Sequence, residues 1–208
     1  MNSIEKNKLR NSMKKIILTI ISLFIISQNL MANEQTILKN HFLNKIDEVI
    51  EVVQDKSLTK PIRNGKIVEL LTPMFDFTLM AKLSLGKKWK KLSAKDKKEF
   101  VTLYVERMKH SYSSKIDAYS DEKIEITKIK QPKKNRIELV TNLVSKDNKL
   151  EISYKFYKPK KLKMDKDNWL IYDVVILGVS ILKTDKAQFR EFLQTKTIND
   201  LMIQLEKK

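Results

Sequence analysis

The hydrophobic period of this 208-residue sequence changes near Tyr119. From residue 34 to residue 119, apolar residues recur every three or four positions, which predicts amphipathic helices. From residue 120 to residue 182 they alternate with polar residues, most clearly over Leu150–Tyr157, which predicts strands with one buried face. Because the helices precede a run of adjacent strands, the sequence predicts an α+β fold with an antiparallel sheet of about four strands.

Local signals predict where the helices begin and end. Pro61 suits the first turn of a helix that Pro73 interrupts. Asp76 is placed to cap a short helix that ends at Gly86, and Ser93 to cap a long one. The full set of expected helices is Glu34–Lys56, one from Pro61, Phe77–Leu85, a long helix to about Tyr119, one from Thr184 or Asp185, and Thr197–Leu205.

The strands are expected around Ile124–Ile126 and over Ile137–Val144, Leu150–Tyr157 and Trp169–Ile181. The last of these is apolar at both parities apart from Asp173 and Ser180, which predicts a central strand covered on both faces. Lys146–Lys149 is a candidate hairpin turn, and Pro159–Asp167 is expected to be an exposed, lysine-rich loop.

Residues 13–32 have the layout of a secretory signal peptide. Lys14 and Lys15 form a basic start, Ile16–Ile26 form an eleven-residue apolar run, and Ala32 precedes the expected cleavage. A membrane span needs about 20 apolar residues, so a retained anchor is the less favoured alternative. We expect residues 1–32 to be removed, with 1–12 an artefact if translation starts at Met13. Residues 33–208 are then one exported domain, mainly helical over 33–119, sheet over 120–182 and helical over 183–208.

Composition excludes several kinds of chemistry. The chain has no cysteine, so disulfides and thiolate sites are impossible, and it has two histidines. The formal net charge of +17 is compatible with a polyanion-binding surface. However, five of the 42 basic residues are arginine, the residue that usually recognises phosphates and bases, and compositional drift toward lysine also explains the charge. Export would exclude cytoplasmic nucleic acid as a partner.

The polar residues do not form a recognisable active site. His41 and His110 lack carboxylates at ligand spacing and are expected at the surface or its boundary. Asp76 and Asp173 could each be a buried acid–base group, but a helix cap explains the first, and a salt bridge or a bond to a helix end explains the second. The three glycines lie too far apart for a phosphate-binding loop. We therefore predict that the protein is not an enzyme and holds no metal.

Two apolar surfaces are expected to face each other. One is the stripe of the long helix that contains Tyr104, Met108 and Tyr112, and the other is the inner face of the strands. Periodicity alone fits an ordinary core as well as a pocket wall. Met and Tyr side chains suit a deformable pocket with polar tips at its mouth.

Two groups of short motifs carry a family resemblance. The first is Phe75-Asp76-Phe77, Met80-Ala81, Leu85-Gly86, Trp89, Ser93 and Phe100, and the second is Trp169–Val174, Gly178-Val179-Ser180, Gln188-Phe189 and Leu193. In order and spacing, these motifs resemble the MlaC/toluene-tolerance family from about residue 33 to residue 205. Leu177 is a departure, because the family often has Glu before this glycine.

The resemblance implies a periplasmic phospholipid-binding protein. Its fold would be a strongly twisted antiparallel sheet, cystatin-like or nuclear-transport-factor-2-like, wrapped by N-terminal and C-terminal helices around an apolar lipid cavity. Such carriers shuttle lipid between an inner-membrane MCE-domain ABC transporter and an outer-membrane lipoprotein–porin complex, which maintains outer-membrane lipid asymmetry. Phospholipid would be cargo, and no cofactor is implied. The alternatives are an enzyme or a peptide-binding module that uses the same cavity.

We expect the cavity wall to consist of apolar or amphipathic residues on the elements that face each other. These residues are Phe75, Leu83, Leu103, Tyr104, Met108, Tyr112, Val140, Leu143, Tyr154, Phe156, Val174 and Ile176. Docking to partners or membranes is expected at the densest lysine cluster, with Lys160, Lys161 and Lys163 as the leading residues.

Overall fold

The computed structural model describes residues 33–116, 123–146, 148–162 and 164–207. The expected signal peptide over 1–32 therefore lies outside the described residues, as does the end of the long helix beyond Ile116. The chain forms two compact units, which meet in the sequence between Asn40 and His41. In the first unit the described residues, 33–40, are helical, and the second unit, residues 41–208, contains the sheet and the other helices. No helix in the described part of the chain is both long and apolar enough to cross a membrane.

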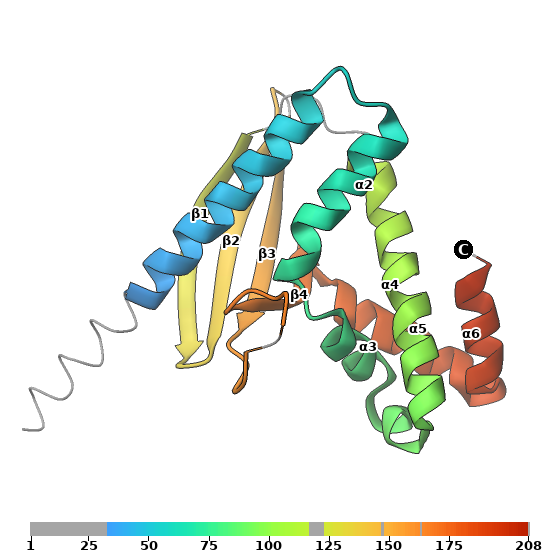
Figure 1. The fold of residues 1–208 in the computed structure, drawn as a ribbon. Coiled ribbons are helices and arrows are strands. Elements are labelled where there is room, and N and C mark those ends of the chain that lie inside the picture. Colours follow the sequence, from blue (N-terminus) through green and yellow to red (C-terminus); the bar gives the residue numbers. More distant parts are fainter. Residues whose placement is uncertain (1–32, 117–122, 147, 163, 208) are drawn as a thin grey trace, which may run out of the picture. The chain divides into compact units, whose positions relative to one another are not determined.

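The helices follow the predicted order (Figure 1). The N-terminal helix covers residues 33–54, and Pro61 lies in the first turn of the next helix, as expected. The others are α2 (Lys60–Leu71), η1 (Thr72–Met74), α3 (Phe77–Leu85), η2 (Gly86–Lys91), α4 (Ala94–Ile116), α5 (Ile181–Thr195) and α6 (Ile198–Glu206).

The predicted caps explain these boundaries. The Asp76 carboxylate accepts a hydrogen bond from Leu79 N at 3.0 Å at the start of α3. Gly86 ends α3 with a φ of 56°, a conformation that glycine adopts without strain. Ser93 and Asp96 bond to each other's backbone N–H at the start of α4, a capping box that satisfies two otherwise unpaired donors.

The sheet has five antiparallel strands in the order β1-β2-β3-β4-β5 (Figure 1). They are β1 (Lys123–Lys133), β2 (Arg136–Val144), β3 (Lys149–Tyr157), β4 (Leu170–Ile176) and β5 (Val179–Ser180). The pairs Leu143↔Leu150 and Ile152↔Ile176 place one row of apolar residues across a single face. Neighbouring residues along a strand point to opposite faces, so the uninterrupted register of β2 with β3 assigns the side chains of these two strands to a face.

The C-terminal end of the sheet differs from the prediction of one central strand over Trp169–Ile181. Leu177 and Gly178 both have positive φ, 49° and 79°, and form a tight turn that separates β4 from a two-residue β5. As a result β4 lies next to the edge of the sheet, where α3 and α5 pack on it. Ser180 then caps α5 by accepting from Lys183 N at 3.0 Å, which starts this helix before the expected Thr184.

A helical core lies between α3, α4, α5 and α6. Its centre is formed by Phe100 and Tyr104 of α4 against Phe189 of α5, with the Phe100 and Phe189 rings 5.9 Å apart at 83°. Met80, Leu201 and other buried apolar residues complete it. Most of α4 is thus used for packing between helices, and this leaves one section of it for the site described next.

Candidate functional site

An apolar cavity of about 360 Å³ lies among residues 41–54, α2, α4 and the sheet. It falls within the range of about 300–1,000 Å³ that is typical of small-molecule pockets. The described lining residues are Ile46, Val49, Ile50, Val53, Val68, Leu71, Thr72, Phe75, Phe77, Met108, Lys109, Ile124, Leu143, Leu150, Ile152, Tyr154, Val174 and Ile176. Most of this wall is therefore aliphatic or aromatic.

The local sequence explains how each element contributes apolar side chains. Ile46, Val49, Ile50 and Val53 recur at helical spacing, so they form one stripe of the N-terminal helix. On the sheet, alternation brings Ile152 and its neighbours in register to the same face.

Few polar groups line the cavity. They are Thr72, Lys109 and the hydroxyl of Tyr154, and no carboxylate or imidazole is among the described lining residues. Burial raises the pKa of Tyr154 to about 12, although its hydrogen bond with Thr141 acts in the opposite direction. Tyr154 is therefore a neutral phenol at physiological pH, and the wall can surround an apolar molecule without supplying an acid–base pair.

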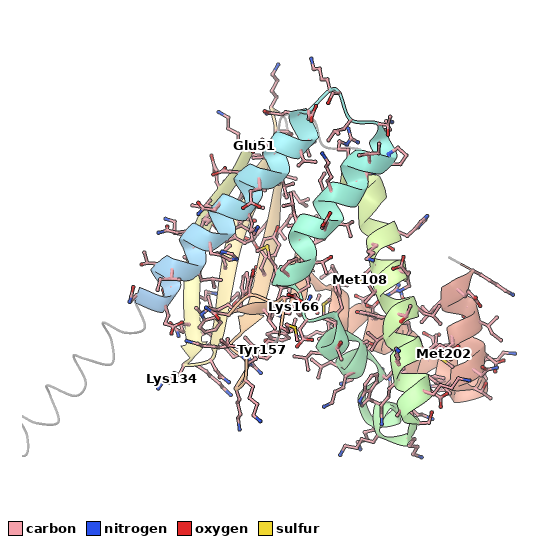
Figure 2. All side chains as sticks on the ribbon, viewed as in Figure 1. Glu51, Met108, Lys134, Tyr157, Lys166 and Met202 are labelled. Atoms are coloured by element: carbon pink, nitrogen blue, oxygen red, sulfur yellow. The ribbon has the colours of Figure 1, made fainter. Side chains whose placement is uncertain are left out.

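A wider, more polar recess of about 780 Å³ adjoins this cavity. The two share Val68, Thr72 and Lys109 as lining residues. The recess also contacts Glu69 and Asp165, and Lys109 forms an exposed ion pair with Glu106 at 3.0 Å. In Figure 2 the neighbouring Met108 lies on α4, which contacts α2. An amphipathic ligand could thus place its apolar part in the cavity and its polar part in the recess.

Half of the twelve residues expected in the wall line the cavity. These are Phe75, Met108, Leu143, Tyr154, Val174 and Ile176. Whether they contact a lipid stays a prediction. The side chain of Tyr112 lies outside the described residues, so its predicted role is also untested.

Five other expected wall residues are not among the described residues that line the cavity. Tyr104 is fully buried in the helical core and donates a hydrogen bond to Asp185 at 2.7 Å, and Leu103 packs against the same core. Val140 has the opposite strand parity to Leu143, so it lies on the other face of the sheet. Phe156 is buried in edge-on contact with Phe42, and Leu83 belongs to α3, which packs on α4 and α5.

Sequence reasoning missed the contribution of the N-terminal helix. Its apolar stripe was visible in the sequence, but periodicity does not show which other element that stripe will face. Leu71, at the end of α2, and Phe77, at the start of α3, were missed for the same reason.

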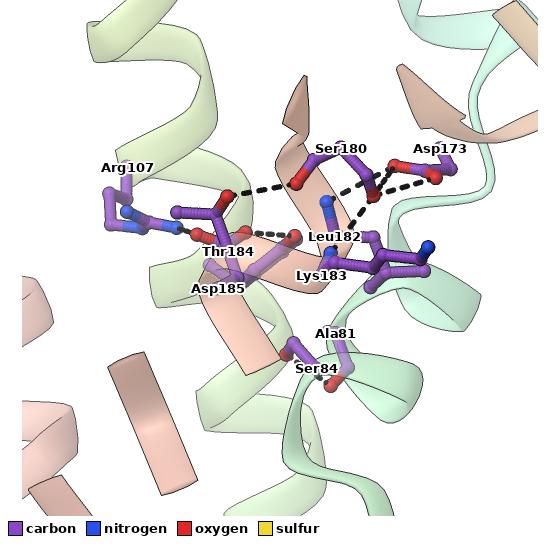
Figure 3. Close-up of polar contacts among 10 residues, drawn as sticks. Ala81, Ser84, Arg107, Asp173, Ser180, Leu182, Lys183, Thr184 and Asp185 are labelled. Atoms are coloured by element: carbon purple, nitrogen blue, oxygen red, sulfur yellow. Dashed lines mark hydrogen bonds and ion pairs between the residues drawn. The ribbon is translucent and has the colours of Figure 1, made fainter. Parts of the chain in front are cut away.

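The two buried carboxylates that could act as acid–base groups have structural partners instead. Asp173 is 3% exposed and accepts hydrogen bonds from Ser180 Oγ at 2.8 Å and Leu182 N at 3.1 Å (Figure 3). It also accepts one from Lys155 Nζ at 3.0 Å. It therefore combines the salt bridge and the bond to a helix end that we expected. Asp76 caps α3 and also accepts a hydrogen bond from the Tyr157 hydroxyl.

The histidines lie at the surface or its boundary, as expected. His41 is half-buried, and its Nε2 lies 2.6 Å from Oδ2 of Asp167, a carboxylate 126 residues away in the sequence. His110 is exposed. Lys160 and Lys161 are exposed in the loop before β4, whereas Lys163 lies outside the described residues. No group of three potential metal ligands occurs in the described part of the chain.

Asp76→Ala should lower the free energy of unfolding by about 1–3 kcal/mol, because it removes the α3 cap and leaves the hydroxyl of the half-buried Tyr157 without this acceptor. Asp76→Asn keeps an oxygen acceptor at the cap and should cost less. Urea unfolding monitored by circular dichroism measures both. Equal losses for the two variants would contradict the capping role.

Comparison with known proteins assigns this arrangement to a family. The family described as MlaC protein matches residues 44–207, which is most of the chain. The chain belongs to the MlaC family. The predicted resemblance is thereby confirmed over the helices, the sheet and the cavity-lining residues from Ile46 onward.

A solved structure matches this MlaC-family fold. It is a phospholipid-binding protein from Ralstonia solanacearum, determined in complex with a phospholipid. The TM-score is 0.68 at 14% sequence identity, and the match covers 83% of this chain and 94% of that one. At this identity the likeness establishes the fold, and it confirms the predicted α+β class with an antiparallel sheet. Among curated proteins, none matches the sequence.

Proposed function

We propose that this protein is a non-enzymatic phospholipid carrier. The observation that carries the proposal is the cavity of about 360 Å³, whose wall consists of apolar residues from the N-terminal helix, α2, α4 and the sheet. Family membership and the phospholipid bound by the Ralstonia protein of similar fold support the same conclusion. The lipid is cargo, and no cofactor takes part.

Transfer free energies explain why such a wall suits an acyl chain. At ~0.8 kcal/mol per CH₂, bringing one chain of about 16 carbons into water costs about 13 kcal/mol. A carrier must replace the bilayer almost methylene by methylene, which needs an apolar wall and no bond-making step. The adjoining recess, with Lys109 at the shared boundary, leaves room for a polar head group.

The route that we propose is the one implied by the family. The protein carries phospholipid through the periplasm between an inner-membrane MCE-domain ABC transporter and an outer-membrane lipoprotein–porin complex, and so maintains outer-membrane lipid asymmetry. The signal-peptide pattern before residue 33 supports export. Fractionation and intact mass of the exported product test this step, and a mature chain that begins at Asn33 is expected.

Two alternative functions, an enzyme and a peptide-binding module, would use the same cavity and can be distinguished from a lipid carrier. An enzyme would need an acid–base group, but Asp76 and Asp173 are both bound to structural partners. A peptide-binding module would need polar groups along its groove to pair with a peptide backbone, and the described wall offers few.

Mass spectrometry of protein purified without detergent separates these functions. We expect co-purified phospholipid in stoichiometric amount and its transfer to acceptor vesicles. A protein that carries peptide, or one that converts the lipid into a product, would overturn the carrier proposal. Lipid transfer from membranes containing the transporter to membranes containing the outer-membrane complex then tests the route separately.

A further inference from the structure

The loop between β3 and β4 is held firmly at its N-terminal base. We call residues 158–169 the lysine loop; its residue 163 lies outside the described part of the chain. Lys158 N donates to Asn135 O at 3.2 Å, and Lys158 Nζ lies 5.9 Å from the centre of the Trp169 ring. Because Trp169 is 4% exposed, the two ends of the loop meet on a buried aromatic residue.

The C-terminal base of the lysine loop is attached to η1 and to the N-terminal helix. Lys166 Nζ donates to Thr72 O at 2.5 Å, and Asp167 N donates to Pro73 O at 3.3 Å. The Asp167 carboxylate also bonds to His41. Figure 2 shows Lys166 beside the C-terminal end of α2. Contacts at both ends of the lysine loop therefore fix the position from which its tip extends.

The tip of the lysine loop exposes two large apolar side chains. Leu162 is 71% exposed and Met164 is 88% exposed, the highest values among the large apolar residues in the described ranges. Lys160 and Lys161 beside them are also exposed. Exposing these apolar side chains to water is unfavourable and adds nothing to the packing of the core. The exposure therefore indicates a surface that is covered in another state.

We propose that the tip of the lysine loop docks on a bilayer that contains anionic phospholipid, with Leu162 and Met164 entering the interface and Lys160 and Lys161 contacting lipid phosphates. A projecting pair of apolar side chains beside flexible cations matches the boundary between head groups and acyl chains. The anionic surface supplies the charge complementarity that the lysines need.

The position of the loop adds a consequence that rests on the proposed carrier function. Asp165, one residue beyond Met164, lines the recess that shares Val68, Thr72 and Lys109 with the apolar cavity. Docking through the tip would therefore bring the recess next to the lipid surface. A lipid leaving the bilayer would then reach the apolar cavity through this recess.

Co-sedimentation with vesicles tests the docking. The protein is expressed from its full sequence, intact mass confirms the same N-terminus for every variant, and the vesicles contain phosphatidylglycerol or phosphatidylcholine alone. At low salt, Lys160→Gln with Lys161→Gln should weaken binding to the anionic vesicles about 25-fold, since each lysine near such a surface contributes about fivefold. Leu162→Ser with Met164→Ser should weaken it about fivefold or more even when salt is raised, because apolar burial is not screened.

Two matched double variants control for general effects. Leu177→Ser with Val179→Ser removes two apolar residues of the same spacing, 66% and 60% exposed, and Lys87→Gln with Lys88→Gln removes an adjacent pair of exposed lysines on η2. Both should bind vesicles like the unsubstituted protein. Losses in the controls as large as in the loop variants, or no vesicle binding by the unsubstituted protein, would overturn the proposal, and the latter would point to an acidic protein surface. Co-purified lipid, measured on the same samples, reports separately on the carrier function.

Discussion

Ile50→Glu should abolish co-purification of phospholipid while leaving a folded protein. Ile50 belongs to the part of the N-terminal helix that lines the cavity and is only partly buried, so the empty protein can tolerate the charge. A bound acyl chain would remove water from the carboxylate without giving it a partner. We expect affinity to fall at least about a hundredfold, equivalent to about 2.8 kcal/mol. Lipid extraction and mass spectrometry measure the occupancy.

Ile62→Glu is the matched control, because Ile62 is 54% exposed on α2 and does not line the cavity. It should retain lipid at the level of the unsubstituted protein. Ile50→Trp tests the same site by volume, since a larger side chain occupies space that the acyl chain needs. If Ile50→Glu and Ile50→Trp both retain full occupancy, this cavity is not where the lipid binds.

Asp185→Ala should lower the free energy of unfolding by about 3–5 kcal/mol, because removing one partner leaves a buried charge without compensation. Asp185 is 3% exposed, pairs with the Arg107 guanidinium and accepts the Tyr104 hydroxyl at 2.7 Å (Figure 3 shows the ion pair). Arg107 also lies over the rings of Tyr104 and Phe189, so it has little room to turn toward solvent. Urea unfolding measures the loss.

Replacing both Arg107 and Asp185 distinguishes the cost of leaving one buried charge unpaired from the cost of lost packing. Arg107→Leu combined with Asp185→Leu removes both charges and keeps apolar volume, so it should recover most of the stability lost by Asp185→Ala. A double variant as unstable as the single one would mean that the hydrogen bond to Tyr104, rather than the stranded charge, dominates. A single variant that loses less than about 1 kcal/mol would show that Arg107 reaches water.

Helix caps and hydrophobic periodicity predicted most element boundaries, because both depend only on residues that are close in sequence. Asp76 caps α3 through a residue three positions away, and Ser93 does the same at α4. Alternation over Leu150–Tyr157 predicted which face of β3 carries the apolar cavity-lining residues Leu150, Ile152 and Tyr154, but not that Ser153 on the other face is also buried. The prediction of one strand over Trp169–Ile181 was wrong because the apolar run contains a turn. Leu177 adopts a positive φ in this turn, a conformation that residues with a side chain rarely adopt.

The candidate cavity was predictable only in part, and strand parity explains one of the errors. Val140 and Leu143 differ by an odd number of positions in β2, so both could not face the same cavity. The sequence contained this information. It contained no comparable signal for Asp185, whose partner Arg107 is 78 residues away.

By itself, the sequence determined the α+β class, the family resemblance and the residues available to form an apolar wall. Only the tertiary structure decided which apolar stripes meet. Within its 23 residues, α4 packs Phe100, Tyr104 and Met108 into the helical core, and of these three only Met108 also lines the cavity. The N-terminal helix supplies the wall that α4 was expected to form. The physical reason is that burial of apolar surface is non-directional, so a stripe gains similar free energy against any complementary face, and chain topology makes the choice.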